Sequence, residues 1–449
     1  MRNSKPTFRL ALAGDAIVNR PVADCSHPSV QAVLKHLKCS DLAYVNCETL
    51  FHDYTGTGVY PAAEGGWSYM RSPPETASDL RRCGIRLMST ANNHALDYSY
   101  GGLFSTHQTL DKAGIAHAGS GMDLASARSP AFVDAGRFRV ALVSMTTTSA
   151  PASRAGMPHD GTQGRPGVNP LRYHLQVDSK AMSEIAAFYT ALGWWVVQVN
   201  DREWQVNPPG LHMSVTRYFV SEGARPGMVL DQDDVDGNLR AIRNAKAYAD
   251  IVIVHVHNHE WDQAKGPQYP PEFLPPFART AIDAGGDVIF AQGGHEPIRD
   301  IELFKGKLIV YDTGDLFSMA ATISHSPHDF YVRHAAALKK PVHEALTCDV
   351  LPARQRFSIE WSRNPAGGTR QGRGQVGAIP VLDFNESGEL SRLVLHPFVH
   401  QNGPKADIGL SFSPDDETAR AIIQQFSVLS KTFKTRIACE EGAGEVTLC

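Results

Sequence analysis

Apolar residues along this chain gather in short continuous runs, and each run ends in polar residues. Continuous runs are typical of strands whose two faces are both buried, whereas strict alternation indicates a strand with one solvated face. We therefore predict buried strands at Phe8–Ala13, Asp41–Val45, Arg86–Thr90, Arg139–Met145, Ile251–Val254, Val288–Ala291 and Leu308–Tyr311.

Between these runs, apolar residues return at helical spacing. In one predicted helix, Leu103, Thr106 and Leu110 share a face, and Gly114 occupies the position where a left-handed residue commonly ends a helix. Strands that alternate with helices predict a mostly parallel, layered α/β fold. The predicted helices are Thr76–Cys83, Gly102–Ala113, Asp236–Ala249 and Pro275–Ala284.

The segment 150–231 breaks this alternation. Its first part, Pro151–Pro170, is rich in Gly, Pro, Ser and Thr, and a predicted helix, Ser179–Leu192, follows. Tryptophans come next, at Trp194, Trp195 and Trp204. We predict that the segment is an insertion that forms a lid or a wall of a substrate site, although each tryptophan is equally compatible with a place in a core.

The last third of the chain has a weaker pattern. We expect one main domain over residues 1–320, which contains the 150–231 insertion, and we expect residues 321–449 to pack on the same domain. The tail Cys439–Cys449 has no evident structure. Strands are predicted at Arg356–Trp361, Gly377–Asp383 and Leu393–Val399, and a helix at Asp415–Ser430.

Composition narrows the class of protein. The chain has 449 residues, 42% of them hydrophobic, and a formal net charge of -4, so it can bury a large core and lacks the basic field of a nucleic-acid-binding protein. The apolar run at Phe8–Ala13 contains Arg9 and is too short for a signal peptide or a membrane span. We therefore expect a cytoplasmic protein with no membrane partner. Its 7 cysteines are scattered and include no C-x-x-C pair, which disfavours a disulfide framework or a cysteine zinc site.

The polar residues that follow the predicted strands carry the chemistry. The carboxyl ends of parallel strands meet at one edge of a sheet, so we expect these side chains to converge. Carboxylate, imidazole and amide groups without a thiolate suit a divalent ion such as Ca, Mn, Mg or Zn. Any one of them alone could be an ordinary cap or turn residue. They are Asp15, Glu48, Asn93, His94, His255, His257, His259, Glu260, His295 and Asp315.

Two positions suggest proton transfer. The amide oxygen of Asn93 can bind a metal and hold the neighbouring His94 near it, free to move protons. Asp97 shares a face with His94 if a helix begins there, and it can then fix the ring tautomer. His295 follows Gly293 and Gly294, which permit close backbone approach, and we expect it to be catalytic or metal-binding.

Histidines 255, 257 and 259 alternate along an extended segment, which places all three on one face. We expect one or two of them, His255 and His257 first, to bind the metal. Asp312 and Asp315 follow the last strand, and they support either the site or a turn.

The order of these motifs resembles the CapA family, named for a protein of poly-γ-glutamate capsule synthesis. The resemblance covers about residues 8 to 318, and it implies a calcineurin-like four-layer sandwich of two β-sheets flanked by helices. It also implies a metal site and an acid/base neighbour, His94. The implied ligands are Asp15, Glu48, Asn93, His255, His257 and His295. The motifs are Gly14-Asp15 with Arg20, Asn46-Cys47-Glu48, Asn92-Asn93-His94 with Asp97, Gly119 with Gly121, His255 with Glu260, Gly294-His295, and Tyr311 to Asp315.

The sequence departs from this family in ways that bear on the chemistry. Cys47 stands where the family usually has Leu, and His255-Val256-His257-Asn258-His259-Glu260 replaces His-Trp-Gly-x-Glu. Phosphatases of the fold begin with Asp-x-His, but Asp15 is followed by Ala16 and Ile17, which removes a ligand and argues against phosphoester chemistry. Capsule members are usually membrane-anchored, and this chain shows no anchor.

Soluble relatives of this kind include peptide epimerases of lasso-peptide biosynthesis. The resemblance therefore implies a metal-dependent epimerase that inverts the α-carbon of a C-terminal residue, tryptophan, in a ribosomal precursor peptide. Epimerisation needs an acid/base group on each face of the carbon, which His94 with Asp97 and His295 with Asp15 or another carboxylate would supply. One alternative is metal-dependent hydrolysis of a peptide, γ-glutamyl or phosphoester bond. Another is a non-catalytic peptide-binding subunit.

Overall fold

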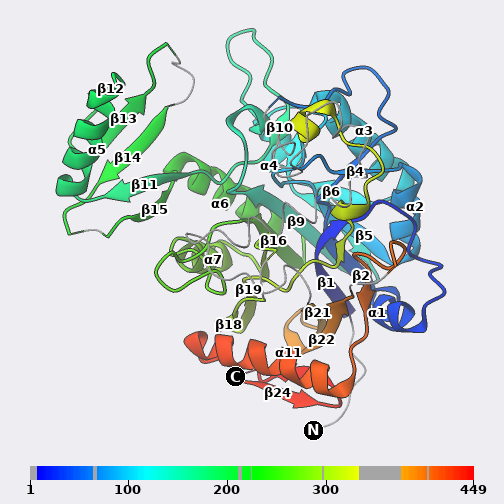
Figure 1. Ribbon diagram of the computed structural model, residues 1–449. Helices are drawn as coiled ribbons and strands as arrows, with labels where there is room; N and C mark the ends of the chain where they lie inside the picture. Colours follow the sequence, from blue (N-terminus) through cyan, green and yellow to red (C-terminus); the bar gives the residue numbers. More distant parts are fainter. Residues whose placement is uncertain are drawn as a thin grey trace.

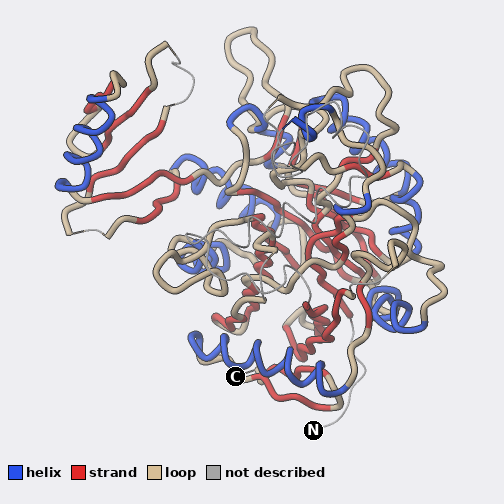
Figure 2. Tube along the Cα trace, viewed as in Figure 1, coloured by secondary structure: helices blue, strands red, loops and turns tan. Residues whose placement is uncertain are grey.

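The computed structural model describes residues 8–63, 68–210, 215–223, 225–295, 298–332, 376–401 and 404–448. Two β-sheets pack face to face at the centre of the molecule, and helices lie on their outer sides (Figures 1 and 2). This arrangement confirms the predicted α/β sandwich. The predicted strand at Arg356–Trp361 lies outside the described residues.

The first sheet has 10 strands and joins the two ends of the chain. Its centre is parallel in the order β1-β2-β5-β6, and the C-terminal strand β21 pairs antiparallel with β1. The tail, predicted to lack structure, instead forms a hairpin on β22. The strands are β1 (Phe8–Ile17), β2 (Leu42–Asn46), β5 (Ile85–Ser89), β6 (Ala116–Ala118), β20 (Phe317–Ser318), β21 (Val376–Phe384), β22 (Leu390–His400), β23 (Ser411–Phe412), β24 (Ile437–Glu440) and β25 (Ala443–Val446).

The second sheet has 6 strands in the order β18-β19-β17-β16-β9-β8. Its four inner strands run parallel, and the two edge strands are antiparallel. Two strands extend further than the apolar runs predicted, since β16 continues to His257 and β17 to Gln292. The strands are β8 (Ala131–Ala135), β9 (Phe138–Thr146), β16 (Ile251–His257), β17 (Val288–Gln292), β18 (Ile301–Phe304) and β19 (Lys307–Val310).

The main core lies between the two sheets. Leu12 and Tyr44 of the first sheet pack with Leu142, Ile253 and Phe290 of the second, and all are fully buried. Burial of one such side chain contributes about 1.5–3 kcal/mol, so this double layer is the principal source of stability. The inward and outward faces of each strand are both covered, which explains the continuous apolar runs in the sequence.

Helices complete the outer layers. Apolar residues of α1, α2 and α3 cover the first sheet, and those of α6 and α7 cover the second. α11 closes the C-terminal end of the core against β22 and β24. Gly114 ends α3 in the left-handed conformation, as predicted. The helices are α1 (Pro28–Lys38), α2 (Glu75–Arg82), α3 (Ser99–Ala113), α4 (Leu124–Arg128), α6 (Gln232–Lys246), α7 (Leu274–Asp283) and α11 (Asp416–Leu429).

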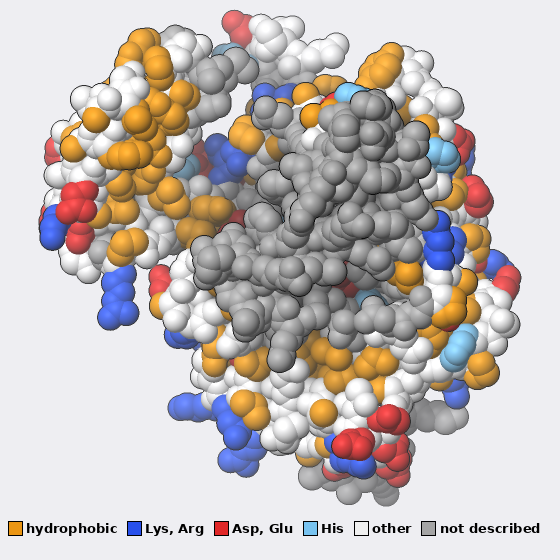
Figure 3. All heavy atoms as spheres, in the orientation of Figure 1, with side chains coloured by type: hydrophobic (Ala, Val, Ile, Leu, Met, Phe, Trp, Pro, Cys, Tyr) orange, Lys and Arg blue, Asp and Glu red, His pale blue; other side chains and the backbone are white. Residues whose placement is uncertain are grey.

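The insertion forms a small unit of its own beside the body of the molecule (Figure 1, left). A 5-stranded sheet is packed against one helix, and Trp194 and Trp204 belong to the small core between them. Trp195 is 51% exposed. Figure 3 shows that hydrophobic side chains gather on the surface of this unit. The unit comprises β11 (Tyr173–Val177), α5 (Ser179–Ala191), β12 (Trp195–Gln198), β13 (Glu203–Asn207), β14 (Thr216–Val220) and β15 (Gly227–Leu230).

The short elements lie in the connections between these layers. They are β3 (Leu50–Phe51), β4 (Arg71–Ser72), β7 (Ser120–Gly121), β10 (Gly167–Val168), η1 (Pro151–Ser153), η2 (Ala320–Thr322) and η4 (Ser430–Phe433).

No helix among the described residues is both long enough and apolar enough to cross a bilayer.

Candidate metal centre

Side chains from both sheets converge where the parallel strands end. The first sheet contributes residues in or after β1, β2 and β5, and the second contributes residues at or after the ends of β16, β17 and β19. This convergence follows from the parallel order of the strands, because their carboxyl ends share one edge. The residues that meet here are Asp15, Asn46, Glu48, Asn93, His94, His257, His259, His295 and Asp315.

Glu48 lies at the middle of the cluster. Its Oε1 atom is 3.3 Å from Nε2 of His295 and 3.7 Å from Nε2 of His257. The Nε2 atoms of His94 and His259 lie 3.8 and 3.9 Å from the same oxygen. The carboxylate is fully buried, and neither oxygen has a hydrogen-bond partner among the described residues.

Asp15 reaches the cluster because β1 approaches another loop unusually closely. A Cβ atom on Gly14 would collide with the carbonyl oxygen of Gly314, so only glycine allows the two backbones to lie together. The Nδ2 atom of Asn46 donates a 2.7 Å hydrogen bond to Oδ1 of Asp15. The other carboxylate oxygen, Oδ2, is buried and has no hydrogen-bond partner in the described part of the chain.

The donor set fits a divalent cation. Buried carboxylate oxygens without hydrogen bonds are costly unless a cation neutralises them. Three groupings of ligand atoms lie close enough together to hold one ion: Asp15 with Glu48 and His257, Asp15 with His295 and Asp315, and Glu48 with His259 and His295. The amide oxygen of Asn93 lies 2.8 Å from Nε2 of His257, beside the first grouping. Oxygen and neutral imidazole ligands suit Ca, Mn, Mg or Zn.

Two histidines in the cluster are paired with aspartates. Nδ1 of His94 lies 2.6 Å from Oδ2 of Asp97, and Nδ1 of His295 lies 3.0 Å from Oδ1 of Asp315. No helix begins at His94, since α3 begins at Ser99, and a turn brings Asp97 to the ring instead. The sequence allowed Asp15 or another carboxylate as the partner of His295. Asp315 is the nearer of the two, because Oδ2 of Asp15 lies 3.6 Å from Nδ1.

The two pairs have an unusual electrostatic environment. Burial lowers the pKa of His94, but the charge and hydrogen bond of Asp97 outweigh burial and raise the pKa overall. Burial also opposes the charged form of His295, yet Glu48 and Asp315 raise its pKa well above the ordinary value. Both rings therefore hold a proton more firmly than a free imidazole does.

The pKa of His257 is shifted in the opposite direction. Burial and the neighbouring imidazoles lower its pKa well below the ordinary value, which keeps the ring neutral, as a metal ligand must be. Burial and the nearby carboxylates of Glu48 and Asp315 raise the pKa of Asp15 well above its ordinary value. The cluster therefore carries an excess of buried acidic groups.

The backbone around His295 is shaped for close contact. His295 itself has a φ of 47°, a left-handed conformation that a non-glycine residue seldom adopts. Gly293 passes so near His257 that a Cβ would lie 2.6 Å from its ring, and Gly294 faces Arg299 and Asp312. The sequence prediction of a close approach at the two glycines is confirmed, and the strain at His295 is typical of a functional position.

The structure separates His255 from the other histidines. Its ring is fully buried beside Tyr44 and Phe290, with centroid distances of 5.7 and 6.3 Å. Burial lowers its pKa to about 3. His255 and His257 face the same way, but two residues of extended chain move His255 about 7 Å deeper into the core. His255 belongs to none of the three ligand groupings, so we no longer propose it as a ligand.

Several neighbours position the centre without forming it. The carboxylate of Glu260 accepts hydrogen bonds from Thr147 and Thr148, at 2.5 and 3.1 Å. Asp312 accepts bonds from the side chain of Gln292 and from backbone N–H groups of Gly294 and Gly314. The sequence left open whether Asp312 and Asp315 support the site or a turn. In the structure Asp312 holds the loop, and Asp315 contacts His295 in the site.

Comparison with known proteins agrees with this fold. Residues 9–320 match the family of the bacterial capsule synthesis protein PGA_cap, and the chain belongs to this family. Two uncharacterized proteins of Sinorhizobium fredii are each 29% identical to it, over 98% of this chain and 93% of their own length. A probable polyglutamine synthesis accessory protein of Mycobacterium tuberculosis is 28% identical, over 70% of this chain and 66% of its own.

Proposed function

We propose that this protein is a metal-dependent acid/base catalyst that epimerises the α-carbon of a peptide residue. The observation that supports this most strongly is the presence of two histidine–aspartate pairs whose Nε2 atoms approach one carboxylate oxygen of Glu48. His94 comes from the first sheet and His295 from the second. A substrate carbon held between them would meet one imidazole on each face.

The chemistry requires one proton to leave and another to arrive. Nε2 of one imidazole, which starts neutral, takes the α-proton, and the electron pair passes into the adjacent carbonyl group. The other imidazole, which starts protonated, gives its proton to the opposite face of the carbon. A hydrogen bond from each Nδ1 to its aspartate fixes the ring so that Nε2 faces the substrate. A bound divalent ion would supply positive charge that stabilises the enolate oxygen. Asp15, Glu48, Asn93 and His257 would hold the ion, because both ring nitrogens of His295 are already used in the proposed proton transfer.

The substrate class follows from the resemblance to soluble peptide epimerases. We propose a ribosomal precursor peptide whose C-terminal residue, tryptophan, is inverted. Such an exchange lies near equilibrium, so a mixture of epimers is the expected product unless a later step removes one of them.

Hydrolysis of an amide bond is the second candidate. Orphaned carboxylate oxygens on Asp15 and Glu48 favour it, because the same ion could activate water and His94 could protonate the leaving group. Phosphoester hydrolysis is disfavoured. Ile17, where phosphatases of the fold have a histidine ligand, is buried with Met70 and Ile323 instead.

Mass spectrometry in D2O separates these reactions. The metal-loaded protein is incubated with a tryptophan-ending precursor peptide, which is then hydrolysed for chiral analysis. A gain of one deuteron per turnover (about one mass unit) without fragments supports epimerisation, provided that His94→Gln and His295→Gln both lose it. Fragments without exchange would replace the proposal with hydrolysis. Neither product would favour a non-catalytic binding role.

A further inference from the structure

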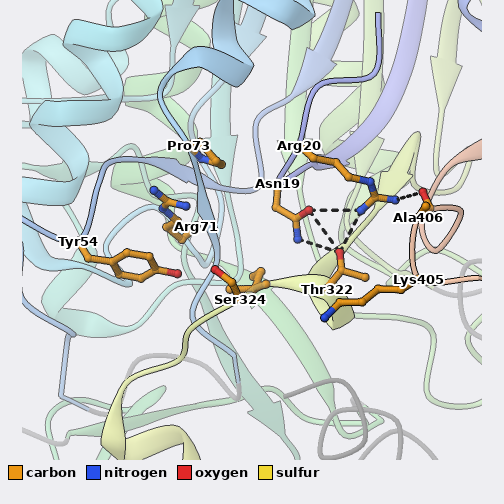
Figure 4. Close-up of a pocket in the computed structure, with 10 residues that line it drawn as sticks. Asn19, Arg20, Tyr54, Arg71, Pro73, Thr322, Ser324, Lys405 and Ala406 are labelled. Atoms are coloured by element: carbon orange, nitrogen blue, oxygen red, sulfur yellow. Dashed lines mark hydrogen bonds between the residues drawn. The ribbon is translucent and has the colours of Figure 1, made fainter. Parts of the chain in front are cut away.

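A basic pocket lies just beyond the end of β1 and has no role in the chemistry described above. Its volume is about 280 Å³, enough for an amino-acid side chain. Arg20, Lys405 and Thr322 lie together on one side of it, and Tyr54 and Arg71 lie on the other (Figure 4).

The described residues that line the pocket carry an excess of positive charge. Three of them are cationic, and none of them is an aspartate or a glutamate. Within the described part of the chain, Arg20 donates to neutral acceptors alone, namely the carbonyl oxygens of Ala406 and Ile408, at 2.7 and 2.8 Å, and the side chains of Thr322 and Asn19.

The acidic groups nearest the pocket lie outside its wall. Asp53 is 3.5 Å from Arg71, but its side chain is 68% exposed. The negative charge of Asp407 raises the pKa of Arg20, and its side chain lines a neighbouring pocket. Lys405 is exposed and forms no ion pair with the residues that the structure describes. Positive charge around a small cavity is a usual arrangement for binding an anion.

Three short connections tie the pocket to the metal centre. Asn19 follows Asp15 by four residues, so their Cα atoms are at most about 14 Å apart. Thr322 lies beyond β20, which pairs with the end of β1. Arg71 follows Met70, whose backbone N–H donates to Asp97, the partner of His94.

We propose that this pocket binds the carboxylate of an acidic side chain in the peptide substrate, within about four residues of the residue that reacts. The substrate assignment depends on the proposed function, whereas the charge and position of the pocket do not. An acidic residue held here would fix the register of the peptide, so that its reacting α-carbon lies between His94 and His295. A carboxylate bound to Arg71 would also hold the neighbouring Met70, whose backbone N–H donates to Asp97.

Two matched peptides test this. Calorimetric titration of the full-length, metal-loaded protein compares acetyl-Glu-Gly-Gly-Trp with acetyl-Gln-Gly-Gly-Trp, which differ only in the charge. The glutamate peptide should bind about tenfold more tightly, because it alone offers a charged acceptor to the pocket. Equal affinities, or no saturable binding of either peptide, would overturn the proposal.

Variants locate the effect. Lys405→Gln and Arg71→Gln should reduce the preference for glutamate severalfold. Lys431→Gln, an exposed lysine in η4 outside the pocket, should leave it unchanged. Arg71 also donates a hydrogen bond to the carbonyl oxygen of His52, so its substitution could unfold the protein. In that case Lys405→Gln is the decisive variant. A preference that survives in Lys405→Gln and Arg71→Gln would refute the pocket assignment.

Two further outcomes separate this inference from the proposed function. Charge-dependent binding without proton exchange would refute the epimerase alone, and exchange with charge-independent binding would refute the pocket alone. If inorganic phosphate binds competitively while the two peptides bind equally, the pocket is a phosphate site, and the carboxylate assignment is wrong.

Discussion

Nδ1 of His94 lies 2.6 Å from Oδ2 of Asp97, and the same oxygen accepts a 2.7 Å hydrogen bond from the backbone N–H of Met70. The aspartate is therefore held from one side by the backbone and holds the imidazole on the other. This leaves Nε2 of His94 free to face Glu48, 3.8 Å away. The proton-transfer role that we propose for His94 would thus depend on Asp97, which positions the ring.

Asp97→Asn should slow turnover by roughly 10²–10⁴-fold without unfolding the protein, because the amide retains the shape but favours the wrong ring tautomer. The rate of deuterium exchange into the peptide measures this, with the thermal midpoint as a check of folding. His94→Gln, which lacks the imidazole ring altogether, is the variant for comparison. Exchange at the wild-type rate in Asp97→Asn would show that the pair has no positioning role.

Metal removal should lower stability as well as activity. An ion that binds only the folded state adds about 2.7 kcal/mol when its concentration is 100 times Kd, so chelation should lower the thermal midpoint and Mn²⁺ or Ca²⁺ should restore it. Differential scanning calorimetry measures this in the absence of any substrate.

Glu48→Gln provides the control for that experiment. It removes a buried negative charge that has no hydrogen-bond partner among the described residues. The metal-free variant should therefore be at least as stable as the metal-free wild type, and added metal should raise its midpoint much less. A full metal-dependent rise in Glu48→Gln would exclude this carboxylate as a ligand.

His255→Phe should keep metal binding, because His255 packs against Tyr44 and Phe290 in the core. His257→Phe should lose metal binding. Equilibrium dialysis with elemental analysis compares the two variants. Loss of the metal in His255→Phe at unchanged stability would restore His255 as a ligand.

The same residue makes stability depend on pH. The folded pKa of His255 is about 3, below the unfolded value near 6.5, so the unfolded chain takes up a proton first. Its contribution to stability is complete above about pH 6.5 and is lost as the pH falls toward 3, by at most about 1.4 kcal/mol per pH unit. Urea denaturation between these values should show a shallower pH slope for His255→Phe. An unchanged slope would contradict the assignment.

Gly14→Ala should destabilise the protein by about 1–3 kcal/mol, because the added methyl group meets the carbonyl oxygen of Gly314. Gly156→Ala is the matched control, since its Cβ would lie 3.4 Å or more from its nearest neighbours. Denaturation midpoints compare the two, and equal losses would show that the approach of β1 to the 312–315 loop is not tight.

The sequence alone determined the layered fold and named most of the residues that converge at the candidate metal centre. Buried strands and amphipathic helices are visible locally, because each is specified by its own periodicity. Asp15, Glu48, Asn93 and His94 end predicted parallel strands, and such ends must share an edge. The spacing of His94 and Asp97 allowed their contact in a turn as well as in a helix.

Only the tertiary structure decided choices that depend on distant partners. His255 and His257 share a face of β16, and only the length of β16 places His257 at the edge and His255 in the core. Asp315, rather than Asp15, pairs most closely with His295 because of how the loop after β19 packs. The C-terminal hairpin forms on β22, far away in sequence. Local sequence encodes what an element is, whereas packing between elements fixes which of its side chains meet.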